Sequence, residues 1–297
     1  MPRTNHPPRE RRRTLPDWFK KPLPQGGATR PVRELVGRLS LHTVCESAKC
    51  PNLSECWSRK TATFMVMGNN CTRRCFFCSV PKAKPDPLDP DEPRRVAEAV
   101  RRLGLEHVVI TSVDRDDLPD KGAGHFVAVV RALRRAGDFV IEVLTPDFKG
   151  RPQGADEVAA AGPDIFNHNV ETVARLYRRV RPGADYEGSL ALLERAKRHA
   201  PGMLTKSGLM VGLGETDDEV LGVLRDLRRA GCDIVTIGQY LRPSDRELPV
   251  DRYVTPEAFA ELAARGRALG FLGVYAGPFV RSSYNAGRVY AHVAARR

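Results

Sequence analysis

The sequence predicts an α/β fold: a partial, laterally open (β/α)6 barrel of the TIM type with an N-terminal and a C-terminal extension. Short apolar runs rich in β-branched residues recur about every 25 to 45 residues, and stretches of helical period separate them. Intervening helices imply a parallel sheet with right-handed crossovers, and six such units are fewer than the eight that close a full barrel. A doubly wound open sheet is the alternative. The strands are expected at residues 63–67, 107–112, 139–144, 164–168, 207–212 and 233–238.

Three of the connecting segments show a clear helical period. Proline near the first turn, at Pro93 and Pro256, is typical of a helix start. Gly104, Gly137 and Gly231 follow the last apolar residues and are expected to form left-handed C-terminal caps. The apolar faces consist of Val96, Ala99, Val100 and Leu103; Phe126, Val129, Val130 and Leu133; and Val220, Val223, Leu224 and Leu227.

Composition favours one large domain, since the chain has 297 residues of which 41% are hydrophobic. No run of 18 apolar residues and no secretory signal is seen, so a cytoplasmic protein without a membrane partner is expected. The net charge is +12, and residues 1–30 carry eight basic and two acidic residues, half of that excess, with six prolines. We expect a mobile basic arm at 1–15, an N-terminal extension at 16–62, the barrel at 63–240 and a C-terminal extension at 241–297.

The basic arm is not expected to bind nucleic acid. No aromatic residue interleaves with its arginines before Trp18. An acidic protein partner or a solvated arginine-rich surface explains the charge equally well.

Cys71, Cys75 and Cys78 lie in one short loop directly after the first predicted strand, separated by three and by two residues. Thiolates suit zinc or an iron–sulfur cluster. Zinc requires four ligands, and this loop has neither a nearby histidine nor a fourth cysteine. A cubane held by three thiolates would leave one iron open to a small ligand.

A second triplet, Cys45, Cys50 and Cys56, lies upstream with four and five intervening residues. By spacing alone it is a second structural metal site, or part of one zinc site assembled from both triplets. Six cysteines in two tight triplets indicate reduced metal ligands rather than disulfides. The seventh, Cys232, is expected to be a small buried thiol.

The loop of Cys71 to Cys78, with the aromatic Phe77 before its last cysteine, resembles the signature of the radical S-adenosylmethionine (SAM) enzymes. In that family the open iron binds the amino and carboxyl groups of SAM, and an electron passed through the cluster cleaves it to a 5′-deoxyadenosyl radical. Longer blocks resemble the lipoyl synthase family within it. They are Leu41–Cys45, Cys50–Asn52, Glu55–Trp57, Thr111–Asp117, Phe166–Thr172, Lys206–Glu215, Thr236–Leu241 and Ala276–Tyr284.

The resemblance implies two 4Fe-4S clusters. Cys71, Cys75 and Cys78 would hold the SAM cluster, and Cys45, Cys50, Cys56 and Ser283 the auxiliary cluster. A serine oxygen is a harder ligand than a thiolate and binds iron of such a cluster less well. This choice makes physical sense if the auxiliary cluster is broken down during the reaction.

The same resemblance implies the reaction and the partners. Two sulfur atoms enter at C6 and C8 of an octanoyl chain attached to a lysine of a lipoyl carrier domain, at the expense of two SAM and of the auxiliary cluster. The carriers are E2 subunits of 2-oxoacid dehydrogenases and the glycine cleavage H protein. A flavodoxin or ferredoxin would donate the electrons, and an iron–sulfur carrier would rebuild the cluster.

SAM contacts are expected in the loops that follow the strands, where ligands of such folds bind. For each residue the alternative is an ordinary strand-end turn. His42 and His168 are expected to be structural, and Asn285 and Thr145 depart from the usual family residues, His and Ile. The expected contacts are Phe77, Thr111, Ser112, Asp114, Asn167, Asn169, Glu171, Gly212, Gly214 and Glu215.

Two other functions fit the cysteine pattern. One is a radical SAM methylthiotransferase acting on RNA, although the chain shows no further RNA-binding domain after residue 250. The other is a non-enzymatic iron–sulfur electron carrier or scaffold, whose cluster would have no open iron for SAM.

Overall fold

One sheet of eight strands forms the centre of the molecule in the computed structural model, which describes residues 15–21 and 27–295. Residues 1–14 of the predicted basic arm lie outside the described residues. The strands are β1 (His42–Thr43), β2 (Thr63–Val66), β3 (His107–Ser112), β4 (Val140–Leu144), β5 (Ile165–Asn167), β6 (Leu204–Val211), β7 (Ile234–Gln239) and β8 (Gly273–Gly277).

The strands follow one another in chain order, β1 to β8. Neighbours from β2 to β8 are parallel, and β1 pairs antiparallel with β2. No pairing joins β1 to β8 within the described residues, so the barrel is open on one side. The predicted open barrel is confirmed, and its six expected strands are β2 to β7. The prediction missed β1 and β8.

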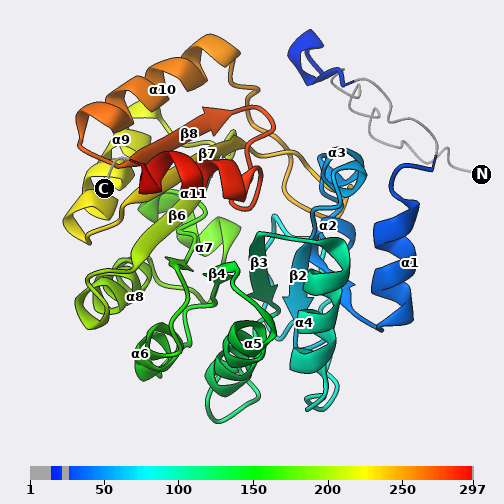
Figure 1. Ribbon diagram of the computed structural model, residues 1–297. Coiled ribbons are helices and arrows are strands. Elements are labelled where there is room, and N and C mark those ends of the chain that lie inside the picture. Colours follow the sequence, from blue (N-terminus) through cyan, green and yellow to red (C-terminus); the bar gives the residue numbers. More distant parts are fainter. Residues whose placement is uncertain (1–14, 22–26, 296–297) are drawn as a thin grey trace, which may run out of the picture.

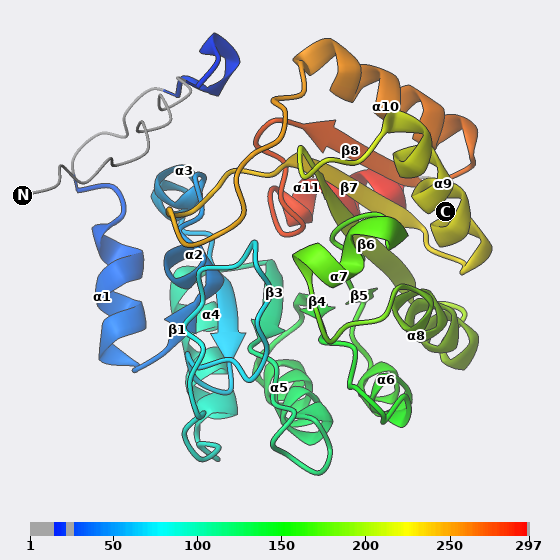
Figure 2. The ribbon, with the colours of Figure 1, turned by 180° about the vertical axis from the view of Figure 1, so that it is seen from behind.

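Helices surround the curved sheet on its outside (Figures 1 and 2). Within the described part of the chain none of them is long and apolar enough to cross a membrane. The α-helices are α1 (Arg30–Arg38), α2 (Val44–Ser47), α3 (Leu53–Ser58), α4 (Glu92–Leu103), α5 (Ala123–Ala136), α6 (Gln153–Ala160), α7 (Tyr177–Val180), α8 (Tyr186–His199), α9 (Asp217–Arg229), α10 (Pro256–Ala268) and α11 (Ala286–Ala294), and the 3-10 helices are η1 (Asp17–Phe19) and η2 (Ala174–Leu176).

The ends of the helices follow the local sequence in most cases. The Thr255 hydroxyl accepts a hydrogen bond from the Ala258 amide at the start of α10. Gly104 and Gly231 adopt the expected left-handed conformation, with φ of 65° and 77°. The expectation for Gly137 is wrong: its φ of 165° is extended, and the Phe139 ring packs against it.

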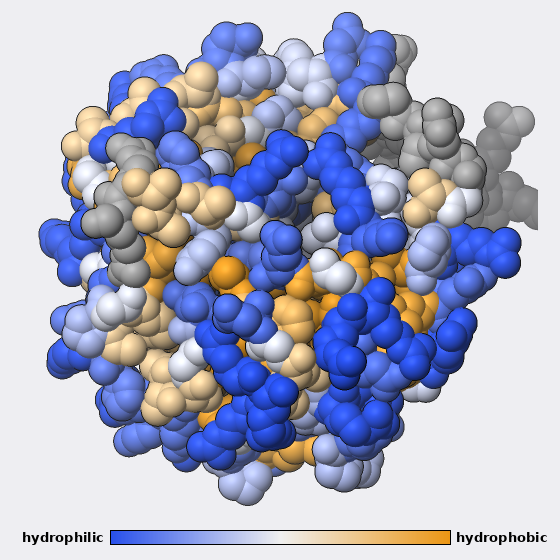
Figure 3. Space-filling view, in the orientation of Figure 1, coloured by the Kyte–Doolittle hydropathy of each residue, from blue (hydrophilic) through white to orange (hydrophobic). Residues whose placement is uncertain are grey.

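Helix α11 closes the amino-terminal end of the barrel. Its Val289 and Val293 are buried against the first residues of β5, β6 and β7, which are Ile165, Leu204 and Ile234. Figure 1 shows α11 in front of the strands, and Figure 3 shows mostly polar side chains on the same face, with apolar ones visible between them. The carboxyl ends of the strands are therefore left for ligands, at the opposite end of the barrel.

Candidate functional site

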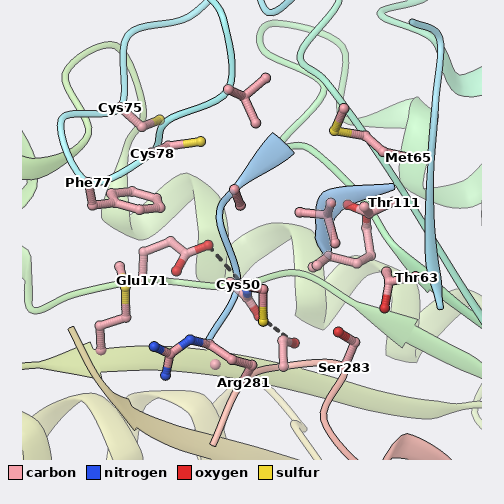
Figure 4. Close-up of a pocket in the computed structure, with 18 of the residues that line it drawn as sticks. Cys50, Thr63, Met65, Cys75, Phe77, Cys78, Thr111, Glu171, Arg281 and Ser283 are labelled. Atoms are coloured by element: carbon pink, nitrogen blue, oxygen red, sulfur yellow. Dashed lines mark hydrogen bonds between the residues drawn. The ribbon is translucent and has the colours of Figure 1, made fainter. Parts of the chain in front are cut away.

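A cavity of about 530 Å³ lies at the carboxyl ends of the strands. Six cysteines line it, although they come from two segments, and Ser283 lines it from the far end of the chain. Figure 4 shows Cys75 and Cys78 with Phe77 on one side of this space, and Cys50 with Ser283 on the other. The cysteines that line the cavity are Cys45, Cys50, Cys56, Cys71, Cys75 and Cys78.

The first thiol loop begins five residues after β2 and is held by backbone hydrogen bonds. The Cys71 amide donates to the Pro81 carbonyl over 2.9 Å, and the Thr72 amide donates to the Asp114 carbonyl over 3.1 Å. The sulfur of Cys71 lies 3.7 Å from a carboxylate oxygen of Asp114. The loop is thereby fixed to the segment that follows β3.

Arg73 belongs to this loop, and its side chain is 6% exposed. Its guanidinium lies 2.7 Å from Asp116 and 2.7 Å from Asp147, which follow β3 and β4, and 3.7 Å from Asp114. Burial alone would lower the pKa of Arg73, but the hydrogen bonds to Asp116 and Asp147 raise it. Arg73 therefore ties the thiol loop to two neighbouring strand ends.

The second triplet lies on two short helices and the turn between them. Cys45 is in α2, Cys56 is in α3, and the Cys50 amide between them donates to the Cys45 carbonyl over 3.0 Å. Thr43 starts α2 by accepting a hydrogen bond from the Glu46 amide. These turns are local in sequence, so the spacing of the three thiols follows from the segment itself.

The thiols are suited to soft metal ligation. Burial raises the pKa of Cys56 and of Cys75 to about 12 and that of Cys71 to about 11, so a bound cation is needed to displace their protons at neutral pH. All seven cysteines are free.

The two triplets offer thiol donors, which suit both zinc and iron–sulfur clusters. Across residues 15–21 and 27–295, no three His, Cys, Asp or Glu side chains gather closely enough to hold a metal ion. A zinc ion needs four ligands at about 2.0 to 2.3 Å. A cubane spaces its ligands more widely, and thiols with one hydroxyl are donors that suit iron.

Residues 278–285 carry Ser283 into the cavity between the barrel and the N-terminal extension. The Ser282 hydroxyl accepts a hydrogen bond from the Asn167 side chain over 2.7 Å and donates to the side-chain amide oxygen of Asn169, Oδ1, over 3.0 Å. On the other side, the Tyr284 hydroxyl donates to Glu55 over 2.8 Å. Ser283 is thus held between two fixed residues.

Two arginines also line the cavity, Arg181 buried and Arg281 half-buried, and neither was expected from the sequence. Arg181 donates to the Asn169 carbonyl over 2.8 Å, and Arg281 donates to the Val280 carbonyl over 2.7 Å. Burial lowers the pKa of Arg281, although the charges of Cys50 and Glu171 raise it in part. Burial also raises the pKa of Glu171. Single arginines in a chain with 48 basic residues carry no spacing signal that could have identified them.

Six of the ten expected SAM contacts line the cavity: Phe77, Thr111, Ser112, Asp114, Asn169 and Glu171. The other four are not among its lining residues. Asn167 donates to Glu142 in the barrel interior over 2.7 Å and to Ser282 over 2.7 Å, so its amide group is engaged by protein acceptors behind the cavity wall.

The loop after β6 also turns away from the cavity. The Glu215 carboxylate accepts hydrogen bonds from the amides of Gly212 and Leu213 over 2.7 and 2.9 Å. The Gly212 carbonyl accepts from Asp251, and Gly214 lies against the same residue. Gly212, Gly214 and Glu215 therefore form a closed turn beneath the segment that follows β7.

His168 lines the cavity, although the sequence analysis treated it as structural. Burial lowers its pKa to about 4, so the ring is neutral at pH 7. Its Nδ1 lies 2.9 Å from the Thr145 carbonyl oxygen, which assigns the proton to Nδ1. Cys232 is fully buried outside the cavity, as expected.

An open parallel barrel with a three-thiol loop after its first parallel strand defines the class of protein. A model of the Radical SAM superfamily matches residues 65–227, more than half of the chain, and the chain is a radical SAM enzyme with a 4Fe-4S cluster and SAM as cofactors. The chain belongs to the lipoyl synthase family. It is 55% identical to the lipoyl synthase of Rubrobacter xylanophilus over 91% of this chain and 85% of that protein. It is 57% identical to the lipoyl synthase of Methylococcus capsulatus, again over 91% and 85%.

Solved structures support the fold. Methylornithine synthase (PylB) aligns with a TM-score of 0.56 and 17% identity over 82% of this chain and 74% of that one. HydG, a maturase of the FeFe hydrogenase, aligns with a TM-score of 0.57 and 14% identity over 89% and 66%. At such identities the likeness concerns the fold alone.

Proposed function

We propose that this chain inserts two sulfur atoms, at C6 and C8, into an octanoyl group attached to a lysine of a lipoyl carrier protein. The observation that supports this most is that both thiol triplets and Ser283 line one cavity. A radical formed on one side of such a space would meet a sulfur source on the other.

Cys71, Cys75 and Cys78 would hold the SAM cluster, which supplies reductive cleavage of SAM to a radical that removes hydrogen from unactivated carbon, twice per product. Cys45, Cys50 and Cys56 from residues 16–62, with Ser283 from residues 241–297, would hold the auxiliary 4Fe-4S cluster that supplies the sulfurs. Ser283 as an oxygen ligand would leave iron more readily than a thiolate, which suits a cluster that is consumed.

The charged groups of the cavity suit SAM, which carries a carboxylate and an ammonium. Arg181 is a buried cation available to the carboxylate, and Asp114 and Glu171 are acceptors for the ammonium. Thr111, Ser112, Asn169 and the neutral His168 offer further hydrogen bonds. The Phe77 ring forms part of the wall.

Apolar side chains complete the cavity and suit an octanoyl chain. Val44, Met65, Leu209 and Met210 line it. They would exclude water and keep competing hydrogen donors from the radical. The carrier proteins would be E2 subunits and the glycine cleavage H protein, and an iron–sulfur carrier would rebuild the auxiliary cluster.

Mass spectrometry of an octanoylated carrier peptide tests the reaction. The reduced enzyme and SAM should give a product whose mass reflects replacement of two hydrogens by two sulfurs. If the peptide is unchanged while an RNA substrate gains methylthio groups, the methylthiotransferase alternative holds. If SAM leaves the cluster spectrum unchanged, the electron-carrier alternative holds.

Cys45→Ala separates the two clusters. Anaerobic reconstitution of the wild type should yield about eight irons per chain, as two cubanes. The variant should keep about four, still cleave SAM to 5′-deoxyadenosine and form no lipoyl product. Cys232→Ala is the matched control, because Cys232 is buried outside the cavity, and it should keep about eight irons. Lipoyl product from Cys45→Ala would contradict the assignment of the sulfur donor.

A further inference from the structure

We propose that a small acidic protein carrying one electron docks on the outer side of the first thiol loop, at a surface formed by Phe76 with Arg74, Arg178 and Arg246. We call this surface the Phe76 patch. The inference rests on the proposed function, because cleavage of each SAM requires one electron from outside the chain.

Phe76 is an apolar side chain that the fold leaves exposed. It is 44% exposed, whereas the adjacent Phe77 lines the cavity. The other large apolar side chains exposed among the described residues, Leu15 and Trp18, lie in the N-terminal part of the chain. A rigidly held, exposed aromatic ring has no role in the core and is typical of an interaction surface.

The position of Phe76 is fixed from both sides. Its amide donates to the Val180 carbonyl at the end of α7 over 2.8 Å, and its carbonyl accepts from the Leu248 amide over 3.0 Å. Three segments far apart in the sequence therefore meet at Phe76. A preformed patch of this kind binds without an ordering penalty.

These three segments carry a positive excess. Arg74 lies on the thiol loop, Arg178 two residues before Val180, and Arg246 two residues before Leu248, and all three are exposed. Residues 74–76, 178–180 and 242–248 together contain five arginines and two carboxylates, those of Asp245 and Glu247. An acidic partner is therefore attracted to this side.

The patch is close to the place where an electron is needed. Phe76 directly follows Cys75 in the chain and lies two residues before Cys78. In each transfer the donor would be oxidised by one electron and the cluster reduced by one. Cleavage of the SAM carbon–sulfur bond then uses that electron and gives methionine and the 5′-deoxyadenosyl radical.

A redox partner fits the Phe76 patch better than the lipoyl carrier does. The carrier must insert its octanoyl chain into the cavity, whereas Phe76 does not line the cavity. An electron donor needs only a brief encounter beside the cluster, and such complexes use small interfaces. Arginine and aromatic side chains are enriched at the centres of interfaces.

Arg74→Glu and Phe76→Ser test the proposal, with Arg178→Glu as a second charge reversal on another element. Arg135→Glu is the matched control, because Arg135 is exposed near the end of α5, and helices after parallel strands end at the amino side of the barrel. Formation of 5′-deoxyadenosine is measured with reduced flavodoxin as the donor and, separately, with dithionite. Binding of flavodoxin is measured by calorimetry at low and high salt.

With reduced flavodoxin at low salt, the charge reversals should raise the KM for flavodoxin about tenfold and weaken its binding by the same factor. High salt should reduce the difference. The rate of Arg178→Glu with dithionite should equal that of the wild type, because dithionite needs no docking surface, and Arg135→Glu should resemble the wild type throughout.

Equal effects of Arg74→Glu and Arg135→Glu on flavodoxin binding would overturn the proposal. A raised KM for the octanoylated carrier with dithionite as the donor would also overturn it and assign the patch to the carrier. A wild-type enzyme that cleaves no SAM even with dithionite would instead overturn the proposed function.

Discussion

A buried ion pair in the barrel interior joins the strands beneath the candidate site. The Lys206 ammonium lies 2.9 and 3.1 Å from the two carboxylate oxygens of Glu142, and both side chains are fully buried. Asn167 donates to the same carboxylate and also to Ser282. A continuous set of hydrogen bonds thus runs from the middle of the barrel to the residue beside Ser283.

This pair should make stability depend on pH. Burial alone would raise the pKa of Glu142, but Lys206 and His107 lower it to about 2, below its ordinary value of 4.5. A carboxyl whose pKa is lowered by folding stabilises the protein above the unfolded value and loses that contribution as pH falls. We expect the free energy of unfolding to drop by about 3 kcal/mol between pH 5 and pH 2 through this group. Denaturant unfolding at several pH values measures it.

Lys206→Met is the comparison that isolates this contribution. The variant leaves a buried carboxylate without its cation and should be less stable by about 3 to 5 kcal/mol at pH 7. The deficit should shrink as pH falls, because burial raises the pKa of Glu142 in the variant and its carboxyl then takes up a proton. The double variant with Glu142→Gln should recover much of the loss. Parallel stability curves for wild type and Lys206→Met would show that the pair does not set the pH dependence.

At the scale of elements, the sequence predicted those parts of the fold that have a strong local pattern. The six expected strands are all present because each is a run of apolar residues between recognisable helices. The prediction missed β1, which has two residues, and β8, in which only Val274, Tyr275 and Ala276 stand between two glycines. Their pairing with β2 and β7 stabilises them, and a single sequence does not display such tertiary contacts.

Prediction of the site was likewise limited to features that are local in the sequence. The spacing of the cysteines is local, so both triplets could be found from the sequence, and both line the cavity. The turn of Gly212, Gly214 and Glu215 was expected there because it follows a strand. Its position depends on how Glu215 binds the backbone of its own turn and on Asp251 above it. The side chain of Asn167 is turned by the buried Glu142 on another strand.

The position of the segment that carries Ser283 depends on Gly238 near the end of β7. A Cβ at this position would overlap the carbonyl oxygen of Val280. Gly238→Ala should therefore destabilise the protein by about 1 to 3 kcal/mol and increase hydrogen exchange in residues 278–285. Gly222→Ala on α9 is the control, because nothing lies within 4 Å of its Cβ, and alanine should stabilise that helix slightly. Unchanged exchange in residues 278–285 would show that the segment does not depend on Gly238.

At the scale of the whole molecule, the barrel joins parts of the chain that are far apart in sequence. The segments of Cys45 to Cys56 and Cys71 to Cys78 lie near the start of the chain, and Ser283 near its end, yet all line one cavity. Helix α11 follows directly after Ser283 and packs at the opposite end of the barrel. The C-terminal segment therefore contributes both to the candidate site and to closure of the barrel.

Val293→Ala tests whether these two ends of the barrel unfold together. Val293 is fully buried against the starts of β5, β6 and β7, so its truncation should destabilise the protein by about 1 to 3 kcal/mol. Arg288→Ala on the exposed face of α11 should change stability by less than about 0.5 kcal/mol. If one cooperative core joins both ends, circular dichroism and loss of cluster absorbance should report a single midpoint that shifts equally in the variant. If α11 unfolds at a lower temperature while the cluster absorbance keeps its wild-type midpoint, closure of the barrel is independent of the site.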